Sequence, residues 1–327
     1  MAARAFLRGR FVFLLTLLTL GCAKAPAEGE TSPASAAVTF RIGYQKSGAA
    51  LALLKWRSTL EPALAELKVK LEWAEFSSGP ALLEALNAEQ LDFGFVGEAP
   101  PIFAQAASTR MVYLATEPAA PQSEALLVRK DSPLKTLADL RGRSVALNKG
   151  SNVQYFLVKA LEHAGLAYAD VKVVYLPPAD ARAAFERGIV DAWAIWDPYL
   201  ASVQVSQSPR VLATAEGVAQ NQQLYVGRRD FVEQHPAVLK AVLQSLHATD
   251  AWLGEHGAEA TGYLAPQLGI DPAAATLWLG RTKFGVFPLS EDVLENQQHI
   301  ADTFQRLGLV PQRLRVRDAL AKAKVFP

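Results

Sequence analysis

The sequence is poor in cysteine, since Cys22 is the only one among 327 residues. A single cysteine excludes an internal disulfide and a cysteine-based zinc cluster. Because this cysteine follows an apolar run at the start of the chain, it also excludes a cysteine nucleophile in the folded part. The five histidines show no H-E-x-x-H spacing, and G-x-x-x-x-G-K-[ST], G-x-G-x-x-G and G-x-S-x-G are absent. We therefore expect no metal and no cofactor.

An excess of charge of either sign is also lacking. The chain has 33 Lys and Arg against 32 Asp and Glu. Residues 1–21 contain three of the arginines (Arg4, Arg8 and Arg10) and no acid, so the remainder has 33 − 3 = 30 basic against 32 acidic residues, a net charge of −2. This balance argues against a nucleic-acid partner. Any bound anion would have to be held by local dipoles.

Long hydrophobic runs are missing, and the one near the start, "FVFLLTLLTL" (11–20), has ten residues. Ten residues are too few for a membrane-spanning helix. With basic residues before it and Gly21 after it, this run predicts a secretory signal peptide over 1–21. Cys22 resembles the cysteine of a bacterial lipoprotein box, although Thr19 stands where that pattern has leucine. We expect lipidation of Cys22; the alternative is cleavage after Ala25-Pro26-Ala27.

Residues 22–37 follow as a predicted lipid-anchored tether, because "AKAPAEGETSPASAA" has no bulky apolar residue. From Val38 on, strand and helix patterns alternate, which favours largely parallel sheets covered by helices. The predicted strands are Val38–Tyr44, Lys70–Phe76, Leu91–Gly97, Met111–Ala115, Ala125–Arg129, Ser144–Leu147, Val171–Leu176, Val190–Ile195, Arg210–Ala213 and Leu224–Arg228. The predicted helices are Ala49–Glu66, Pro80–Ala88, Pro100–Ala107, Asn152–Ala164, Ala179–Arg187, Pro198–Ser206, His235–Gly254, Ala258–Leu268, Pro272–Arg281, Glu291–Leu307 and Val316–Lys324.

Two extended stretches, "EALLVRKDS" (124–132) and "QQLYVGRRD" (222–230), predict crossings between two lobes. Lobe 1 would comprise 38–123 and 225–327, and lobe 2 would comprise 124–224. Ligands of open α/β sheets bind at the carboxyl ends of strands, and clefts between domains are favoured sites.

Four predicted strand-to-helix turns share small and polar residues: "GYQKSGAA" (43–50), "FSSGPALLEAL" (76–86), "FGFVGEAPPIFAQ" (93–105) and "NKGSNVQYF" (148–156). A helix start offers unpaired N–H groups and a partial positive charge, so converging helix starts can form an anion site. Ordinary helix capping is the alternative for each of them.

The stretch "DAWAIWDPYL" (191–200) combines two tryptophans with an Asp-Pro pair at a strand end. Trp193 is expected in the core, and Trp196 is a candidate wall for an apolar ligand tail or a packing residue. Asp197 is either a helix cap or a ligand contact. For Glu98 too, a structural role and a ligand contact both stay open, because a carboxylate beside a bound anion is unfavourable.

These stretches resemble substrate-binding proteins of ABC transporters for aliphatic sulfonates, with taurine- and nitrate-binding relatives. The resemblance rests on "RIGYQKSGAALALLKWR" (41–57), "GPALLEALNAEQLDFGFVGEAPPIFAQA" (79–106), "DLRGRSVALNKGSNVQYFLVKALEHAGL" (139–166), "YLPPADARAAFERGIVDAWAIWDPYLA" (175–201) and "NQQHIADTFQRLGLVP" (296–311). It implies a type II periplasmic-binding-protein fold of the α/β class, with mixed sheets flanked by helices and a ligand cleft between two lobes. The implied ligand contacts are Gln45, Gly79, Glu98, Ala99, Gly150, Ser151, Asn152, Trp196 and Asp197.

The resemblance further implies a monomeric binding protein, not an enzyme, that closes on an alkanesulfonate and delivers it to an ABC permease and its ATPase for sulfur acquisition. The protein would be periplasmic and would meet the membrane only through lipidated Cys22. The alternative ligands are taurine, nitrate or a thiamin-pyrimidine precursor, and Glu98 and Asp197 would suit the ammonium of taurine. Enzymes of similar fold use cysteines that the folded part of this chain lacks.

Overall fold

The computed structural model describes residues 38–107 and 110–326, which belong to one compact unit. The predicted signal peptide, Cys22 and the tether lie outside the described residues. Within the described residues, no helix is both long and apolar enough to cross a membrane.

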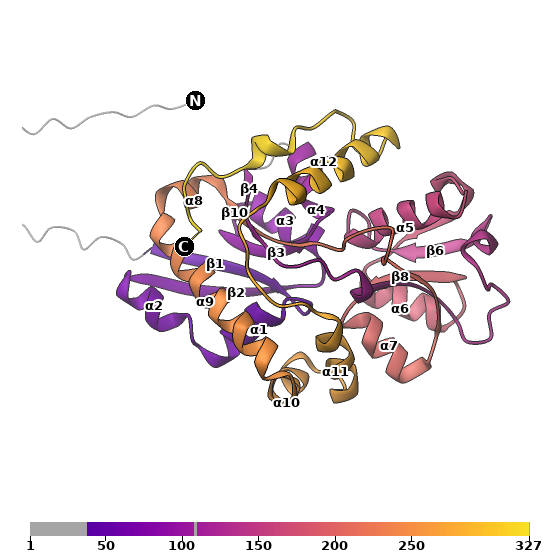
Figure 1. Ribbon diagram of the computed structural model, residues 1–327, viewed down its shortest axis with the longest axis horizontal. Helices are drawn as coiled ribbons and strands as arrows, with labels where there is room; N and C mark the ends of the chain where they lie inside the picture. The colour runs from indigo at the N-terminus through magenta and orange to yellow at the C-terminus, as the bar shows by residue number, and fades with distance from the viewer. Residues whose placement is uncertain (1–37, 108–109, 327) are drawn as a thin grey trace, which may run out of the picture. The chain divides into compact units, whose positions relative to one another are not determined.

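Two five-stranded sheets form the framework, in the strand orders β2-β1-β3-β10-β4 and β7-β6-β8-β5-β9. Figure 1 shows the first sheet in indigo and purple, apart from β10, and the second in pink. The first sheet contains β1 (Val38–Gln45), β2 (Val69–Phe76), β3 (Phe93–Gly97), β4 (Met111–Thr116) and β10 (Gln223–Arg228). The second contains β5 (Glu124–Val128), β6 (Ser144–Leu147), β7 (Lys172–Tyr175), β8 (Ala192–Trp196) and β9 (Arg210–Thr214).

Both sheets are mixed, as the family resemblance implied, whereas the alternation of strands and helices alone favoured largely parallel sheets. The strands β1, β2 and β3 run parallel, and β10 is antiparallel to both of its neighbours, β3 and β4. In the second sheet β5 is likewise antiparallel to β8 and β9. The antiparallel strands β5 and β10 each begin where the chain passes from one sheet to the other. Each therefore enters its sheet from the end opposite to that of the neighbouring strands.

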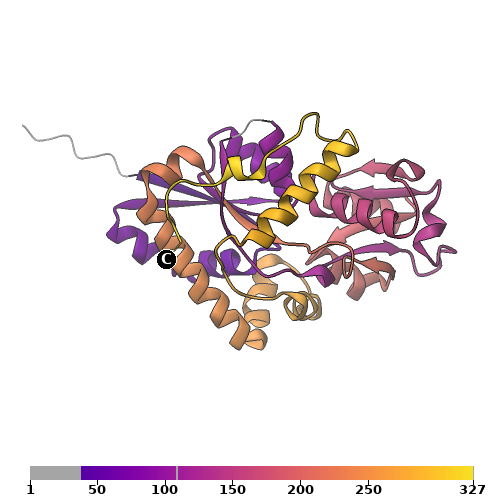
Figure 2. The same cartoon turned by 45° about the horizontal axis from the view of Figure 1, so that its top comes forward.

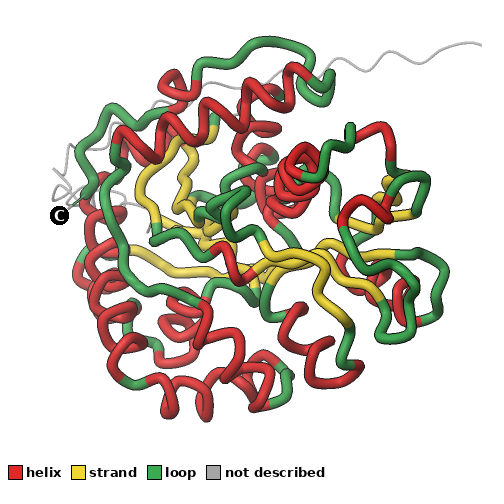
Figure 3. Tube along the Cα trace, turned by 45° about the vertical axis from the view of Figure 1, so that its right-hand side comes forward, coloured by secondary structure: helices red, strands yellow, loops and turns green. Residues whose placement is uncertain are grey.

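Helices cover both faces of each sheet, as Figure 3 shows with helices in red and strands in yellow. One core of the first sheet contains side chains of α1, α2 and α8–α11, and the other contains side chains of α3, α4 and α12. In the second sheet α5 packs on one face and α6 and α7 on the other. The bounds are α1 (Ala49–Arg57), α2 (Glu61–Glu66), α3 (Gly79–Asn87), α4 (Pro100–Ala106), α5 (Asn152–His163), α6 (Pro178–Glu186), α7 (Tyr199–Gln207), α8 (Arg229–Gln234), α9 (Pro236–Glu255), α10 (Gly257–Leu268), α11 (Pro272–Arg281) and α12 (Glu291–Arg306).

Two helix predictions were wrong. The helix expected over 49–66 is two helices, because Ser58 adopts a left-handed conformation (φ 50°) that ends α1. The helix expected over 316–324 is only a 3-10 turn, Val316–Ala319, after which Leu320 pairs with Tyr113 of β4 in an isolated bridge. The C-terminal segment thus continues along the first sheet instead of coiling away from it.

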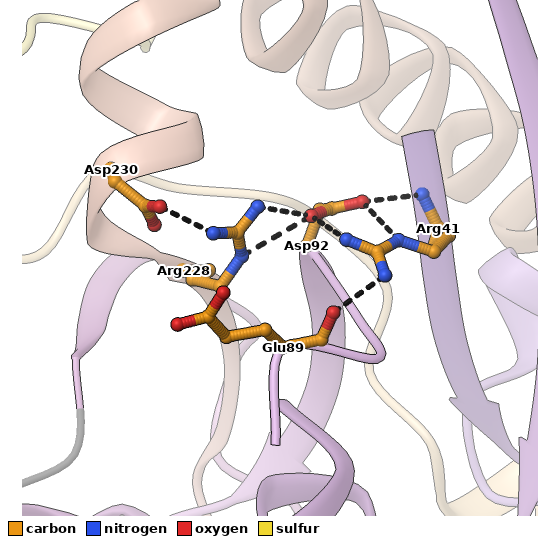
Figure 4. A network of polar contacts seen from close by, with 5 residues as sticks. All are labelled: Arg41, Glu89, Asp92, Arg228 and Asp230. Carbon is orange, nitrogen blue, oxygen red and sulfur yellow. Dashed lines mark hydrogen bonds and ion pairs between the residues drawn. The ribbon is translucent and has the colours of Figure 1, made fainter. Parts of the chain in front are cut away.

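A buried ion network fixes the end of the first sheet where β1 and β3 begin (Figure 4). Asp92, just before β3, is fully buried and accepts hydrogen bonds from the guanidinium groups of both Arg41 and Arg228. Arg228, at the end of β10, also pairs with Asp230. One carboxylate therefore ties β1, β3 and β10 together at the end of β3 opposite Gly97.

Elements of the two sheets also touch each other directly. The helix α11 packs against α7 of the second sheet, and Arg306 of α12 pairs with Glu162 of α5 at 2.9 Å. Figure 2 shows α12 lying beside the strands of the first sheet. The helices α11 and α12 therefore pack on the first sheet and also contact helices that cover the second.

Candidate functional site

One cavity lies between the two sheets and encloses about 630 Å³ of empty space, part of it open to solvent. Its walls come from the ends of β1, β3, β4 and β8, from the starts of α3, α4 and α5, and from the end of α11. The lining residues are Gln45, Ser47, Gly79, Gly97, Pro100, Glu117, Pro118, Ala120, Ser123, Ser151, Asn152, Trp196, Asp197, Asn221, Gln223, Trp278, Thr282 and Lys283.

The structure brings six of the nine predicted site residues to this cavity and places three behind its wall. Lining it are Gln45, Gly79, Ser151, Asn152, Trp196 and Asp197; behind the wall lie Glu98, Ala99 and Gly150. Lys149, the residue before Gly150, is exposed and lies over the Tyr175 ring, outside the lining.

At the start of α5, most of the expected donors are already in use. The N–H of Gly150 donates to Oε1 of Gln154 at 2.7 Å, and the Ser151 hydroxyl donates to the carbonyl of Asn148 at 2.6 Å. The backbone N–H groups of Asn152 and Val153 have no acceptor among the described residues. The helix start therefore still offers two N–H groups and its dipole to an anion.

The starts of α3 and α4 differ in whether they have unpaired N–H groups. In α3 the N–H groups of Gly79 and Ala81 have no acceptor among the described residues. In α4 the first two residues are Pro100 and Pro101, which have no N–H. The prediction that all four turns present N–H donors was therefore wrong for α4. Gly79 is required by packing, because a Cβ there would lie 2.8 Å from Cγ of Pro100.

Asn152 links the two sheets across the cavity. Its Oδ1 accepts the N–H of Ala99 at 3.0 Å, and its Nδ2 donates to Oδ1 of Asn221 at 2.8 Å. The side chain fills the space beside Gly97, where a Cβ would lie 2.2 Å from its Oδ1. Gly97 thus permits the close approach of α5 to the end of β3.

Gln45 ends β1 with a buried side chain. Its Nε2 donates to the carbonyl of Phe95 at 2.8 Å. Because that bond turns the amide nitrogen toward β3, the amide oxygen is the end of the Gln45 side chain left for other contacts.

Glu98 is fully buried behind the wall of the cavity. Its carboxylate accepts the N–H groups of Asn221 and Gln222 and the side-chain amide of Asn296, at 3.0 to 3.2 Å. Burial raises the pKa of Glu98 to about 7, although these three bonds act in the opposite direction. Its acceptor positions are therefore occupied by protein donors.

Asp197 joins the second sheet to α11. Both carboxylate oxygens accept from Nη1 of Arg281 at 3.1 Å, and Oδ1 also accepts the N–H of Ala201 in α7. Burial raises the pKa of Asp197 to about 6, against the opposing effect of Arg281. Asp197 thus accepts an N–H from the first turn of α7, although the N-cap of that helix is Pro198, and an ion pair occupies the carboxylate that was considered for an ammonium.

Two indoles line the cavity, only one of which was a candidate. Trp196 comes from the end of β8, and Trp278, on α11, was missed because nothing in a helix far along the chain signals a return to the site. Glu117, Ser123, Asn221 and Lys283 were missed too. They lie in connections or beyond helix ends, where no periodicity points to a shared surface.

Taken together, the cavity has uncharged donors at one end and aromatic walls. Within the described residues, no three His, Cys, Asp or Glu side chains converge to hold a metal. Unpaired N–H donors at helix starts suit a small permanent anion, and the indoles suit an apolar group attached to it.

Two mixed sheets whose neighbouring ends enclose a polar and aromatic cavity define a periplasmic-binding-protein fold. The solved structure of the alkanesulfonate-binding protein SsuA from Xanthomonas axonopodis pv. citri bound to MOPS matches with a TM-score of 0.84 and 37% identity, over 89% of this chain and 100% of that chain. The periplasmic aliphatic sulphonate binding protein SsuA from Escherichia coli matches with a TM-score of 0.79 and 38% identity, over 87% of this chain and 92% of that chain.

The sequence matches the family model described as NMT1/THI5 like over residues 65–260. A relative from Escherichia coli (strain K12), named for binding aliphatic sulfonates, is 39% identical over 292 residues, which cover 89% of this chain and 90% of the relative. The chain belongs to the NMT1/THI5-like family.

Proposed function

We propose that this protein is the extracytoplasmic substrate-binding component of an ABC importer, and that it captures aliphatic sulfonates and delivers them to the permease for sulfur acquisition. The observation that supports this most directly is the cavity. Unpaired N–H groups of α3 and α5 and the indoles of Trp196 and Trp278 border the same space. The relatives and structures at 37–39% identity are named for the same class of ligand.

The chemistry of a sulfonate fits these groups. A sulfonate stays ionised at any growth pH, so the site needs donors and no proton switch. Its three oxygens accept several charge-assisted hydrogen bonds, each worth roughly 1.5–3 kcal/mol. Burying an alkyl tail against indoles adds roughly 0.8 kcal/mol per CH₂.

The site would work by closure of two lobes, which we assign to 38–123 with 225–327 and to 124–224. Asn152 bonds to Ala99, and Asp197 bonds to Arg281, so each of these contacts joins one proposed lobe to the other. A ligand that binds better to the joined arrangement than to the separated one shifts the equilibrium toward closure.

A binding role is better supported than catalysis. The relatives and solved structures at 37–39% identity are named as binding proteins. The described residues contain no cysteine, so a cysteine nucleophile is not available in them. Export to the periplasm and lipidation of Cys22 complete the proposal, and they rest on residues 1–22 of the sequence.

Calorimetric titration tests the ligand class. Ethanesulfonate and octanesulfonate should bind the purified protein, the longer one more tightly, whereas sulfate and nitrate should bind weakly. Tight binding of nitrate or sulfate with no response to alkanesulfonates would contradict the proposal. For the anchor, Cys22→Ser should release the protein from the membrane fraction, and retention there would refute lipidation at Cys22.

A further inference from the structure

The loop before α5, residues 148–151, leaves the first turn of that helix uncapped. A serine at the N-cap normally accepts an N–H of the first turn through its side-chain oxygen. The Ser151 side chain makes no such bond and instead donates its hydroxyl to the carbonyl of Asn148 at 2.6 Å. The N–H groups of Asn152 and Val153, which have no acceptor among the described residues, are therefore left for a ligand.

Gln154, in the first turn of α5, holds this loop from behind. Its side chain is buried and does not line the cavity. Its Oε1 accepts the N–H of Gly150 at 2.7 Å. In the usual capping box the third residue of the helix accepts the N–H of the N-cap residue, whereas Gln154 reaches one residue further back. The Gly150 N–H is thereby occupied by the protein itself.

Two tyrosines fix the orientation of the Gln154 amide. Its Nε2 donates to the hydroxyls of Tyr168 at 3.1 Å and of Tyr175 at 3.2 Å. Tyr168 belongs to the 3-10 turn Tyr168–Asp170 and Tyr175 ends β7, so both lie outside α5. An exchanged amide would set an N–H donor against the N–H of Gly150. With its nitrogen held by the tyrosines, the amide therefore directs its oxygen at Gly150.

Gly150 in turn lies against the helix starts of the first sheet. It has a left-handed conformation (φ 74°), and a Cβ built on it would lie 3.4 Å from Cδ2 of Phe103 and 3.6 Å from Cγ of Pro80. Pro80 stands in α3 between Gly79 and Ala81, whose N–H groups are the free donors of that helix. The position of Gly150 therefore helps to set the distance between the free donors of α5 and those of α3.

Other contacts of the loop do not replace Gln154. The hydroxyl and the N–H of Ser151 both return to the carbonyl of Asn148, inside the loop. Lys149 lies over the Tyr175 ring, 5.7 Å from its centroid, and is exposed. Among the described residues, Gln154 is the side chain outside the loop that forms a hydrogen bond to it.

We propose that Gln154 is a positioning residue for anion binding, which touches no ligand itself and holds Gly150 so that the free N–H groups of α5 and α3 meet one anionic group. A loop that is already ordered loses less conformational freedom on binding. If the loop were competent in only a fraction of the molecules, the apparent affinity would fall by that fraction. The inference rests on the proposed sulfonate-binding function and assigns how the anion end of the site is held.

Gln154→Leu tests the proposal, because it removes the acceptor for Gly150 and the donors to the tyrosines together. Calorimetry should show roughly 10- to 100-fold weaker binding of ethanesulfonate. The loss should be the same factor for octanesulfonate, because Gln154 acts on the anion end, so the gain per methylene group keeps its wild-type value. General damage to the cavity would change that gain as well.

Gln297→Leu is the matched control. Gln297 in α12 is equally buried, with 1% of its surface exposed, as for Gln154, and its Nε2 also donates to a tyrosine hydroxyl, that of Tyr113. It does not line the cavity. This variant should lose stability in thermal unfolding and bind both sulfonates as the wild type does.

The amide resonances of the loop provide a readout that stability alone does not move. In the wild type, ethanesulfonate should shift the amide protons of Asn152 and Val153 downfield and leave that of Gly150, which is already bonded, nearly unchanged. In Gln154→Leu the Gly150 amide of the free protein should move upfield and exchange faster with solvent. The double variant Tyr168→Phe with Tyr175→Phe, which frees the Gln154 amide, should bind less tightly than the wild type and more tightly than Gln154→Leu.

The double tyrosine variant and the wild-type spectra keep the proposal testable if Gln154→Leu does not fold. Wild-type affinity in Gln154→Leu or in the double variant, or an equal loss in Gln297→Leu, would overturn the positioning role. A ligand-induced shift of Gly150 as large as those of Asn152 and Val153 would do the same, because Gly150 would then contact the ligand directly. Failure of the wild type to bind any alkanesulfonate would instead refute the proposed function, so the two failures are distinguishable.

Discussion

Asn152 illustrates how far residue-level prediction extends. The sequence indicated that Asn152 lies at a helix start beside the ligand site, and the structure places it on the cavity. Its partners could not be predicted, because Ala99 and Asn221 are 53 and 69 residues away in the chain. The same holds for Asp197, whose partner Arg281 is 84 residues away. A side chain's chemistry is local, whereas its partner depends on the whole fold.

Replacing Asn152 with alanine should weaken ligand binding by roughly 10- to 100-fold. The change removes two buried hydrogen bonds, of which the one to Ala99 joins the proposed lobes, and it leaves the N–H of Ala99 unpaired, which costs about 1–3 kcal/mol. Calorimetry with octanesulfonate measures the effect. Ser290→Ala, which removes the side-chain cap of α12 away from the cavity lining, provides a control for altered folding stability. Unchanged affinity in Asn152→Ala would contradict a role for this contact in closure.

Glu98 should make the stability of the protein depend on pH. Burial raises its pKa from 4.5 to about 7, so the folded protein holds the proton more tightly than the unfolded chain does. The resulting stabilisation is complete below about pH 4.5 and is lost as the pH rises through about 7. It amounts to on the order of 3 kcal/mol.

Thermal unfolding followed from pH 5 to pH 8 tests this dependence. The melting temperature should fall with rising pH more steeply for the wild type than for Glu98→Gln. The two slopes are compared, because the amide also changes the hydrogen bonds to Asn221 and Gln222. Parallel slopes would show that Glu98 titrates alike in the folded and unfolded chain.

At the scale of elements, the strands were predictable and their order was not. All ten predicted strands are present among the described residues, since short apolar runs between turn residues mark them clearly. The insertion of β10 between β3 and β4 has no local signal, because it depends on pairing between segments more than a hundred residues apart. The same limit explains why Trp278 and Glu117 were not assigned to the site.

The network around Asp92 should govern the stability of the first sheet without affecting the ligand. Asp92→Asn leaves the partly buried guanidinium of Arg228 without its buried partner just before β3 and should lower the free energy of unfolding by about 3 kcal/mol. Denaturant unfolding measures this loss. The affinity for octanesulfonate should not change, because Asp92 lies at the opposite end of β3 from Gly97. A large loss of affinity would mean that the two ends of the sheet are coupled.

At the scale of the whole molecule, the resemblance of five long stretches indicated the fold, and the structural matches confirm it. The alternation of strands and helices alone would have suggested more parallel sheets than the structure has. The division into lobes stays a prediction. The sheets use β1–β4 with β10 and β5–β9, so the chain passes between them at the β4–β5 and β9–β10 connections.

Ligand-driven closure predicts a change in the dimensions of the molecule. Small-angle X-ray scattering should show a smaller radius of gyration after addition of octanesulfonate, and no change after addition of sulfate. Gly97→Ala should prevent the change, because its Cβ would occupy the position of Oδ1 of Asn152. An identical radius with and without a bound sulfonate would rule out closure as the mechanism.

The late position of β10 has a consequence for the growing chain. Within the first sheet β4 pairs with β10 alone, so its edge stays open until residues 223–228 have been synthesised. The strand β5 likewise waits for β8 and β9. Neither sheet can therefore be completed while the first half of the chain is emerging, and the nascent protein passes through a long stage with unpaired strand edges. A chain whose first sheet cannot close before residue 228 of 327 has been made stays incompletely folded, and so threadable through a secretion channel, for more than half of its synthesis.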